Sequence, residues 1–81
     1  MQVNTCIREL VSSRAISARQ VSADLGKSPT YVQMLGAPTR SPALATVADI
    51  ADVLGYDVAI VDRATGEIVA VVDPPRRAAG E

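Results

Sequence analysis

The hydrophobic pattern of this 81-residue chain changes its period at Gly55, and no other feature limits the possible folds as strongly. Before Gly55, aliphatic residues recur at spacings of three, four and seven, which places them on one face of a helix. After it come two segments rich in Val and Ile, separated by a four-residue turn that ends in Gly66, as in a β-hairpin. The predicted parts are a helical unit over 1–55, a hairpin over 56–73 and a disordered tail over 74–81.

Four helices are predicted within the first part, because four segments carry aliphatic residues at helical spacing. Asn4 or Thr5 can cap the start of the first helix. The inner stripe of the fourth helix is predicted to hold Leu44, Val47, Ala51 and Leu54, with Ile50 at its edge. The predicted helices span residues 3–14, 18–25, 29–35 and, with a start at about either Pro42 or Ala45, a fourth segment that ends at Leu54.

The joints between these helices are short and carry residues suited to helix ends. Ser17 and Ser28 are good N-caps for the second and third helices, and Pro29 fits the first helical position because its missing N–H costs nothing there. Gly26 and Gly55 each follow a helix at once, where a left-handed residue is favoured. The sequence therefore predicts a cluster of four helices with tight connections.

Residues 17–35 carry the most information about function. The tight turn at Gly26 forces the second and third helices to cross steeply, which requires a small residue on the second helix, either Ser22 or Ala23. Val32 and Leu35 are aliphatic and anchor the third helix in the core. The remaining face of this helix is free, and it carries hydroxyl, phenol, amide and thioether groups.

Two strings in this region resemble a known family: SARQVSADLGKSPTYVQML at 17–35 and RSPALATVADIADVLGY at 40–56. The turn glycine, the two anchors that follow it and the terminal Leu-Gly are similar to those of the helix-turn-helix family of phage repressors and Cro-like regulators. The resemblance implies a mostly α, lambda-repressor-like helix-turn-helix bundle of about four helices, here with a C-terminal β-hairpin. Members of this family bind double-stranded DNA as dimers, with the third helix in the major groove. The small residue of the second helix is commonly Ala in the family and is Ser22 here.

The resemblance also implies, by position, two sets of DNA contacts. Amide and hydroxyl groups can hydrogen-bond to base edges, and cations can contact phosphates. Met34 is expected to pack or to form a dimer contact rather than to contact bases. The implied base-contacting residues are Ser28, Thr30 and Gln33. The implied backbone-contacting residues are Arg19, Lys27, Tyr31 and Arg40.

The predicted hairpin is apolar on both faces. Strict alternation places Ile60 and Ile68 on one face and Val61 and Val69 on the other. One face can cover the helices, and the second face or the free strand edge still needs cover. Two hairpins from two chains are expected to join into one sheet, because a lone hairpin is marginal in water. Such a homodimer would place two third helices about 34 Å apart and favour a palindromic operator. The residues predicted to form the dimer contact are Val58, Ile60, Val69 and Val71.

Charge is divided unevenly along the chain. Residues 1–40 carry five basic and two acidic side chains, a net charge of +3, whereas residues 41–81 carry three basic and seven acidic side chains, a net charge of −4. A basic first half favours an anionic ligand. Several charged residues are expected only to be solvated: Asp49, Asp52, Asp62, Glu67, Arg76 and Arg77.

The composition argues against an enzyme. His is absent and Cys6 is the single cysteine, which removes the usual general base, a Ser–His pair and a multi-cysteine zinc site. No metal, cofactor or small-molecule ligand is expected. No apolar run is long enough to span a membrane, and a cytoplasmic protein is expected.

Three functional hypotheses follow. The first is a sequence-specific, DNA-binding transcriptional regulator, with repression by promoter occlusion as the simplest mechanism. The alternative is an antitoxin or adaptor whose apolar hairpin and acidic second half dock on a protein partner such as a toxin. An enzyme is the hypothesis that the composition supports least.

Overall fold

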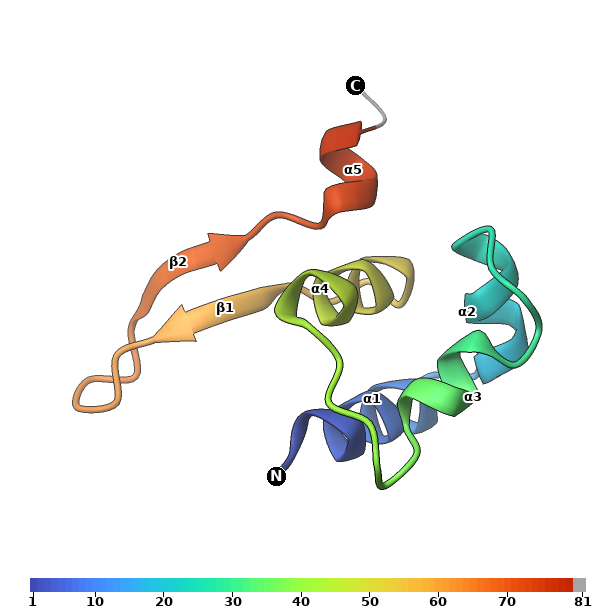
Figure 1. Ribbon diagram of the computed structural model, residues 1–81. Helices are drawn as coiled ribbons and strands as arrows, with labels where there is room; N and C mark the ends of the chain where they lie inside the picture. Colours follow the sequence, from blue (N-terminus) through green and yellow to red (C-terminus); the bar gives the residue numbers. More distant parts are fainter. Residues whose placement is uncertain (80–81) are drawn as a thin grey trace.

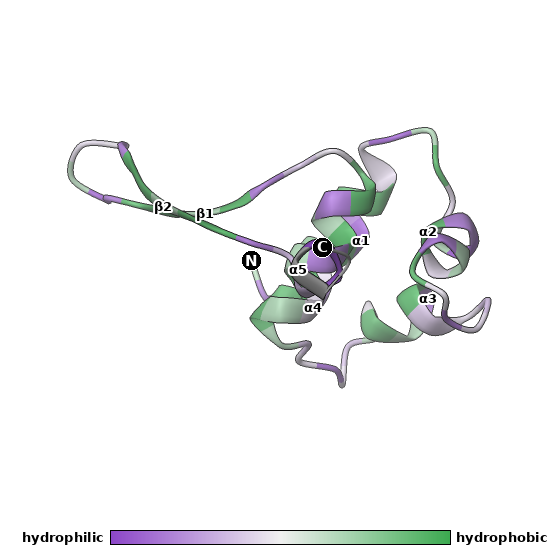
Figure 2. Ribbon diagram, turned by 90° about the horizontal axis from the view of Figure 1, so that it is seen from above, coloured by the Kyte–Doolittle hydropathy of each residue, from purple (hydrophilic) through white to green (hydrophobic). Residues whose placement is uncertain are grey.

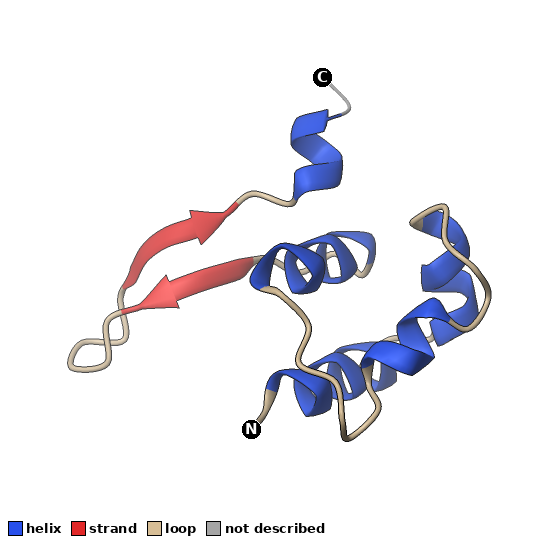
Figure 3. Ribbon diagram, in the orientation of Figure 1, coloured by secondary structure: helices blue, strands red, loops and turns tan. Residues whose placement is uncertain are grey.

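A computed structural model describes residues 1–79 of the chain. The helices of the first part group together, and the hairpin projects from them as an arm (Figure 1). The predicted order of helices followed by a C-terminal hairpin is therefore confirmed, and Figure 3 shows the division between the two. None of the described helices is long and apolar enough to cross a membrane. The elements are α1 (Val3–Ser12), α2 (Ala18–Asp24), α3 (Tyr31–Leu35), α4 (Leu44–Val53), β1 (Val58–Val61), β2 (Ile68–Val72) and α5 (Pro75–Ala79).

The core is aliphatic and receives side chains from each of the first four helices. In α4, Ile50 is fully buried in the core, whereas Leu44 is 53% exposed. The prediction that Leu44 faces inward is therefore wrong, because this first residue of α4 lies outside the core cluster. Ile50 was predicted at the edge of the inner stripe but belongs to the core cluster. The buried core cluster consists of Ile7, Val21, Val32, Val47, Ile50 and Leu54.

The glycines at the ends of α2 and α4 close these helices as predicted. Gly26 has φ +71°, and its N–H donates to the carbonyl of Ala23. The N–H of Lys27 donates to the carbonyl of Ser22 at 2.9 Å, which completes a Schellman motif. The same pair of hydrogen bonds ends α4, where Gly55 has φ +83°. The left-handed glycine turns the chain sharply at both places.

The N-terminal caps agree with the prediction in α2 but not in α1. The Ser17 hydroxyl accepts a hydrogen bond from the N–H of Gln20 at 3.1 Å, as an N-cap does. The N-cap residue of α1 is Gln2, not Asn4 or Thr5. Asn4 instead lies buried within α1.

The third helix begins two residues later than predicted. Thr30 takes the N-cap position with φ −100° and ψ 2°, and α3 starts at Tyr31. Pro29 lies in the turn before the helix, where the N–H of Tyr31 donates to the carbonyl of Ser28 at 3.0 Å. Ser28 is therefore part of the entry turn and not the cap.

The hairpin stands away from the helices instead of covering them. Only the residues at its base are half-buried, and Figure 2 shows the two apolar strands extending beyond the helical body. The register shifts after Ile60, which pairs with Ala70, so that Val61 pairs with Ile68. Val69 is thus the extra residue of a β-bulge. The simple alternation that placed Ile68 on the face opposite Val61 is therefore wrong.

A short helix, α5, occupies part of the predicted disordered tail and docks on α4. The N–H of Arg76 donates to Asp49 at 3.0 Å, and both Arg76 and Arg77 pair with the carboxylate of Asp52. These residues were expected only to be solvated. The hydrogen bond from Arg77, together with the Arg76 contacts, lowers the pKa of Asp52, although partial burial opposes the shift. The last two positions of the predicted tail, 80–81, lie outside the described residues.

Candidate nucleic-acid interface

The crossing of α2 and α3 is held by the hydroxyl of Ser22. This residue is fully buried, and its Oγ donates to the carbonyl of Ala18 at 2.8 Å and accepts from the N–H of Val32 at 3.0 Å. Val32 lies in the first turn of α3, where N–H groups have no acceptor within the helix. Ser22 is therefore the small residue that the crossing requires, and its hydroxyl also provides a hydrogen bond that Ala could not.

The two anchors of α3 determine which of its side chains face outward. Val32 is buried and Leu35 is half-buried against the core cluster. With about 100° of rotation per residue, the opposite face of the helix carries Thr30, Gln33 and Met34. All three are exposed, and we call them the outer face of α3.

Met34 completes the outer face of α3, where the sequence analysis placed its thioether. It is 49% exposed, so the expectation that it packs within its own chain is wrong. Its sulfur lies 3.8 Å from the Thr30 hydroxyl, one helical turn away. That Met34 forms a dimer contact stays a prediction.

The three residues predicted to contact bases are all exposed, but they do not form one set. Thr30 and Gln33 share the outer face of α3. Ser28 precedes the helix and lies in the entry turn. That these residues contact DNA stays a prediction.

Lys27 and Tyr31, two of the predicted backbone contacts, are held together. The Lys27 ammonium lies 5.5 Å from the centre of the Tyr31 ring, within the range of a cation–π interaction. Tyr31 is half-buried and packs against the core cluster. The ring therefore supports the core while it positions the lysine beside the start of α3.

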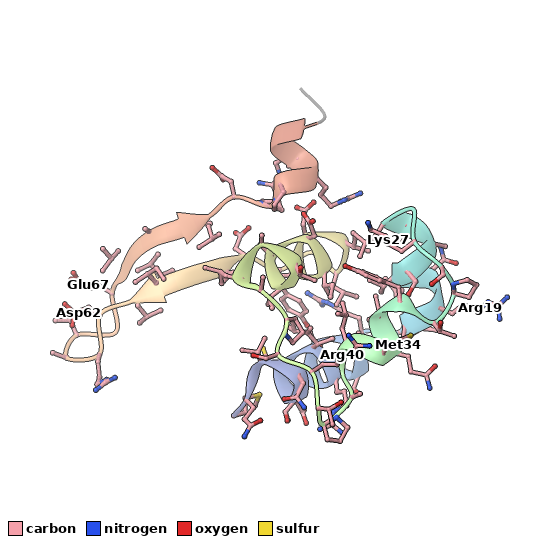
Figure 4. All side chains as sticks on the ribbon, viewed as in Figure 1. Arg19, Lys27, Met34, Arg40, Asp62 and Glu67 are labelled. Atoms are coloured by element: carbon pink, nitrogen blue, oxygen red, sulfur yellow. The ribbon has the colours of Figure 1, made fainter. Side chains whose placement is uncertain are left out.

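Arg19 and Arg40 come from the elements before and after α3. Arg19 lies in the first turn of α2 and points away from the body in Figure 4. Arg40 lies within the loop between α3 and α4, where its N–H donates to the carbonyl of Ala37 at 3.0 Å. The same carbonyl accepts from Nδ2 of Asn4 at 3.0 Å, which ties the loop to α1. Both guanidinium groups belong to exposed residues.

The charge asymmetry of the sequence becomes a separation in space. Asp62 and Glu67 lie exposed at the tip of the hairpin, on the side opposite the labelled residues of α2 and α3 (Figure 4). Asp52 is occupied by Arg76 and Arg77. The acidic groups of Asp62 and Glu67 therefore lie apart from the outer face of α3.

Residues 1–79 contain no group of three or more His, Cys, Asp or Glu side chains placed to hold a metal ion. Cys6 is a free, half-buried thiol.

Comparisons with protein-family models, curated proteins and solved structures find no match for this chain. Function is therefore inferred from the arrangement of α2, α3 and the hairpin.

Proposed function

We propose that this protein is a sequence-specific, double-stranded-DNA-binding transcriptional regulator of the phage-repressor and Cro-like kind. In this proposal, α2 and α3 are the helix-turn-helix and α3 enters the major groove. The observation that carries it is the Ser22–Val32 hydrogen bond. This bond fixes the crossing of two short helices. The side chains on the outer face of α3 are exposed and are not part of the core, so they are free to contact a ligand.

The side chains of this outer face match what base edges offer in the major groove. The Gln33 amide can pair bidentately with adenine, and the Thr30 hydroxyl can donate to or accept from a base. Met34 supplies an apolar contact for a thymine methyl group. Ser28, in the entry turn, would contact a base or a phosphate beside the N-terminal end of α3.

The exposed cations would supply the affinity that does not depend on sequence. Arg19 and Arg40 are exposed, and Lys27 is held beside Tyr31. Phosphate contacts by such groups release counterions, so that binding weakens as salt rises. These residues would orient α3 on the duplex while the outer face selects the sequence.

A homodimer on a palindromic operator is the simplest assembly. Two copies of α3 about 34 Å apart would contact successive major grooves. The exposed hairpin offers apolar surface for the dimer contact through Ile60, Val69 and Val71, whereas Val58 packs against the core of its own chain. Repression would follow from occlusion of a promoter by the bound dimer.

The test is selection of bound fragments from sheared genomic DNA at ~150 mM salt, where non-specific electrostatic binding is weak. We expect enrichment of a palindrome with half-sites one helical turn apart. Gln33→Ala should relax the preference at one base position per half-site by about 1–3 kcal/mol. Gln2→Ala, an exposed glutamine at the start of α1, is the matched control. A folded protein that enriches no sequence would contradict the proposal.

The phosphate contacts can be tested separately on the selected operator. Arg40→Ala should weaken binding to all sequences alike and reduce the slope of log K against log salt by about 1. Arg63→Ala, in the turn of the hairpin, is the matched control because it removes the same charge far from α3. Equal slopes for the two variants would remove Arg40 from the backbone contacts.

A second function, that of an antitoxin or adaptor, is favoured by one observation. Both strands of the hairpin expose large aliphatic side chains, which is uncommon on a surface without a partner. Purification with and without the product of a neighbouring gene separates the two functions. A stable heteromeric complex that forms in the absence of DNA, with no operator selected, would support this second function.

A further inference from the structure

The hairpin arm, defined as residues 58–72, is the first of two uncovered apolar surfaces. It extends from the helical body on the side away from α2 and α3 in both Figures 1 and 2. The β-bulge sets Ile68 and Val69 against Val61 and so gathers aliphatic side chains in the outer half of the arm. The large side chains of the arm that are between 49% and 68% exposed are Ile60, Val61, Ile68, Val69 and Val71.

The second uncovered surface is a groove of about 280 Å³ between the N-terminal ends of α1 and α4. Leu44 and Val3 on this groove are exposed to water. The N-terminus of α1 lies on the same side of the body as the hairpin arm in both views. We call it the basal groove, and its lining residues are Met1, Val3, Cys6, Pro42, Leu44 and Val47.

We propose that the hairpin arm of each chain lies in the basal groove of a second copy. This inference rests on the homodimer of the proposed function and names its contact. The arm is a projecting apolar surface and the groove a recessed one, and both lie on one side of the chain. A two-fold axis between them brings each arm onto the partner's groove, so that the same contact forms twice.

The exposed area is on the scale that a dimer needs. The aliphatic residues that the arm and the groove present to water are between 40% and 68% exposed, which offers roughly several hundred Å² per chain, against the ~800 Å² that one partner buries in a standard interface. Pairing of two hairpins edge to edge would cover the arm but leave Leu44 and Val3 in water. The exchanged arrangement covers both surfaces and leaves the outer face of α3 free.

The single cysteine of the chain gives a direct test, because Cys6 lines the basal groove. Val69→Cys places a second thiol on the exposed arm. Under mild oxidation, we expect this variant to form a reducible dimer on a non-reducing gel. The matched control combines Val69→Cys with Cys6→Ala and should lose the cross-link. A cross-link that persists in the control would show that hairpins pair with each other, and would overturn the proposal.

A mixing experiment tests the reciprocity of the contact. Leu44→Glu damages the groove and Val69→Asp damages the arm, and both side chains are exposed enough for the fold to tolerate the charge. Each variant alone should show a dimer Kd at least tenfold weaker by sedimentation. Mixed, they should form a heterodimer visible by native mass spectrometry, because one arm and one groove remain intact in the mixed pair.

The control for this experiment is Ala45→Glu, which adds the same charge at an exposed position of α4 that does not line the groove. It should change the dimer Kd by less than twofold. The inference would be overturned if the wild-type chain sediments as a monomer even at a protein concentration of about 100 μM. It would also be overturned if the Leu44→Glu variant dimerises with the wild-type Kd. No DNA is present in these measurements, so failure of DNA binding and failure of this contact are distinguishable.

Discussion

Replacement of Ser22 by Ala should destabilise the fold while leaving the outer face of α3 intact. The Ser22 hydroxyl accepts from the buried N–H of Val32 at 3.0 Å. Alanine removes this acceptor but remains small, so the two helices can still cross closely. The Val32 N–H is then left without its partner in a buried site.

The expected size of the effect follows from two opposing contributions. A buried donor left unpaired costs about 1–3 kcal/mol. Alanine is favoured over serine within a helix by up to ~0.5 kcal/mol, which offsets part of that cost. The net loss in the free energy of unfolding is therefore about 1–2 kcal/mol, and Tm should fall by roughly 5–15 °C in a domain of this size.

The assay is urea unfolding followed by far-UV circular dichroism. The midpoint should fall while the slope m stays unchanged, since the substitution removes no surface from the core. Ser12→Ala, in the exposed last turn of α1, should stay within about 0.5 kcal/mol of the wild type. Ser22→Val should cost more than Ser22→Ala, because it also forces an extra methyl group into the crossing.

One result would refute this reasoning. If Ser22→Ala unfolds at the wild-type urea concentration or above it, the hydroxyl is not what holds α3 on α2. The small size of Ser22 would then be its only contribution to the crossing.

Three further predictions concern the turn, the core and the C-terminal helix. Gly26→Ala should cost about 1–2 kcal/mol in urea unfolding, because alanine is strained at the φ of +71° although its Cβ would meet no atom within 4 Å. Ile50→Ala should cost about 2–5 kcal/mol, since this side chain is fully buried. Asp52→Asn should release α5 and raise amide hydrogen exchange at Arg77. The pKa of Asp52 is lowered in the folded chain, so its contact with Arg77 should persist above pH 3.8, the ordinary value, and weaken as pH falls below it. Protection of the Arg77 amide that is the same in the wild type and in Asp52→Asn, and that does not fall in the wild type below pH 3.8, would contradict this.

The candidate site was predictable where it depended on helical spacing. The anchors at Val32 and Leu35, separated by three residues, fixed which face of α3 turns inward, and the exposure of Thr30 and Gln33 follows from that. Met34 was placed on the same free face, but its apolar side chain led to the expectation of packing or a dimer contact there. Ser28 was wrongly predicted to be the N-cap of α3, because a good N-cap residue does not by itself determine where a helix starts.

The hairpin and the tail show a different limit. The two strands and the turn at Gly66 were predictable from alternation and from the glycine. Their position relative to the helices was not, because both faces are apolar and the pattern cannot say which one is covered. The docking of α5 was missed because the basic pair near the C-terminus and Asp52 are 24 and 25 residues apart.

The sequence by itself determined the first four helices, the two strands of the hairpin and the glycines that end α2 and α4. Those features depend on hydrophobic period and backbone conformation within a few residues, which any stretch of sequence carries with it. Only the tertiary structure decided which polar side chains hold the elements together. Asn4 meets a carbonyl 33 residues away and Ser22 meets an N–H 10 residues away. Such partners are set by how the helices pack, because a buried polar group bonds to whatever group the fold brings within reach.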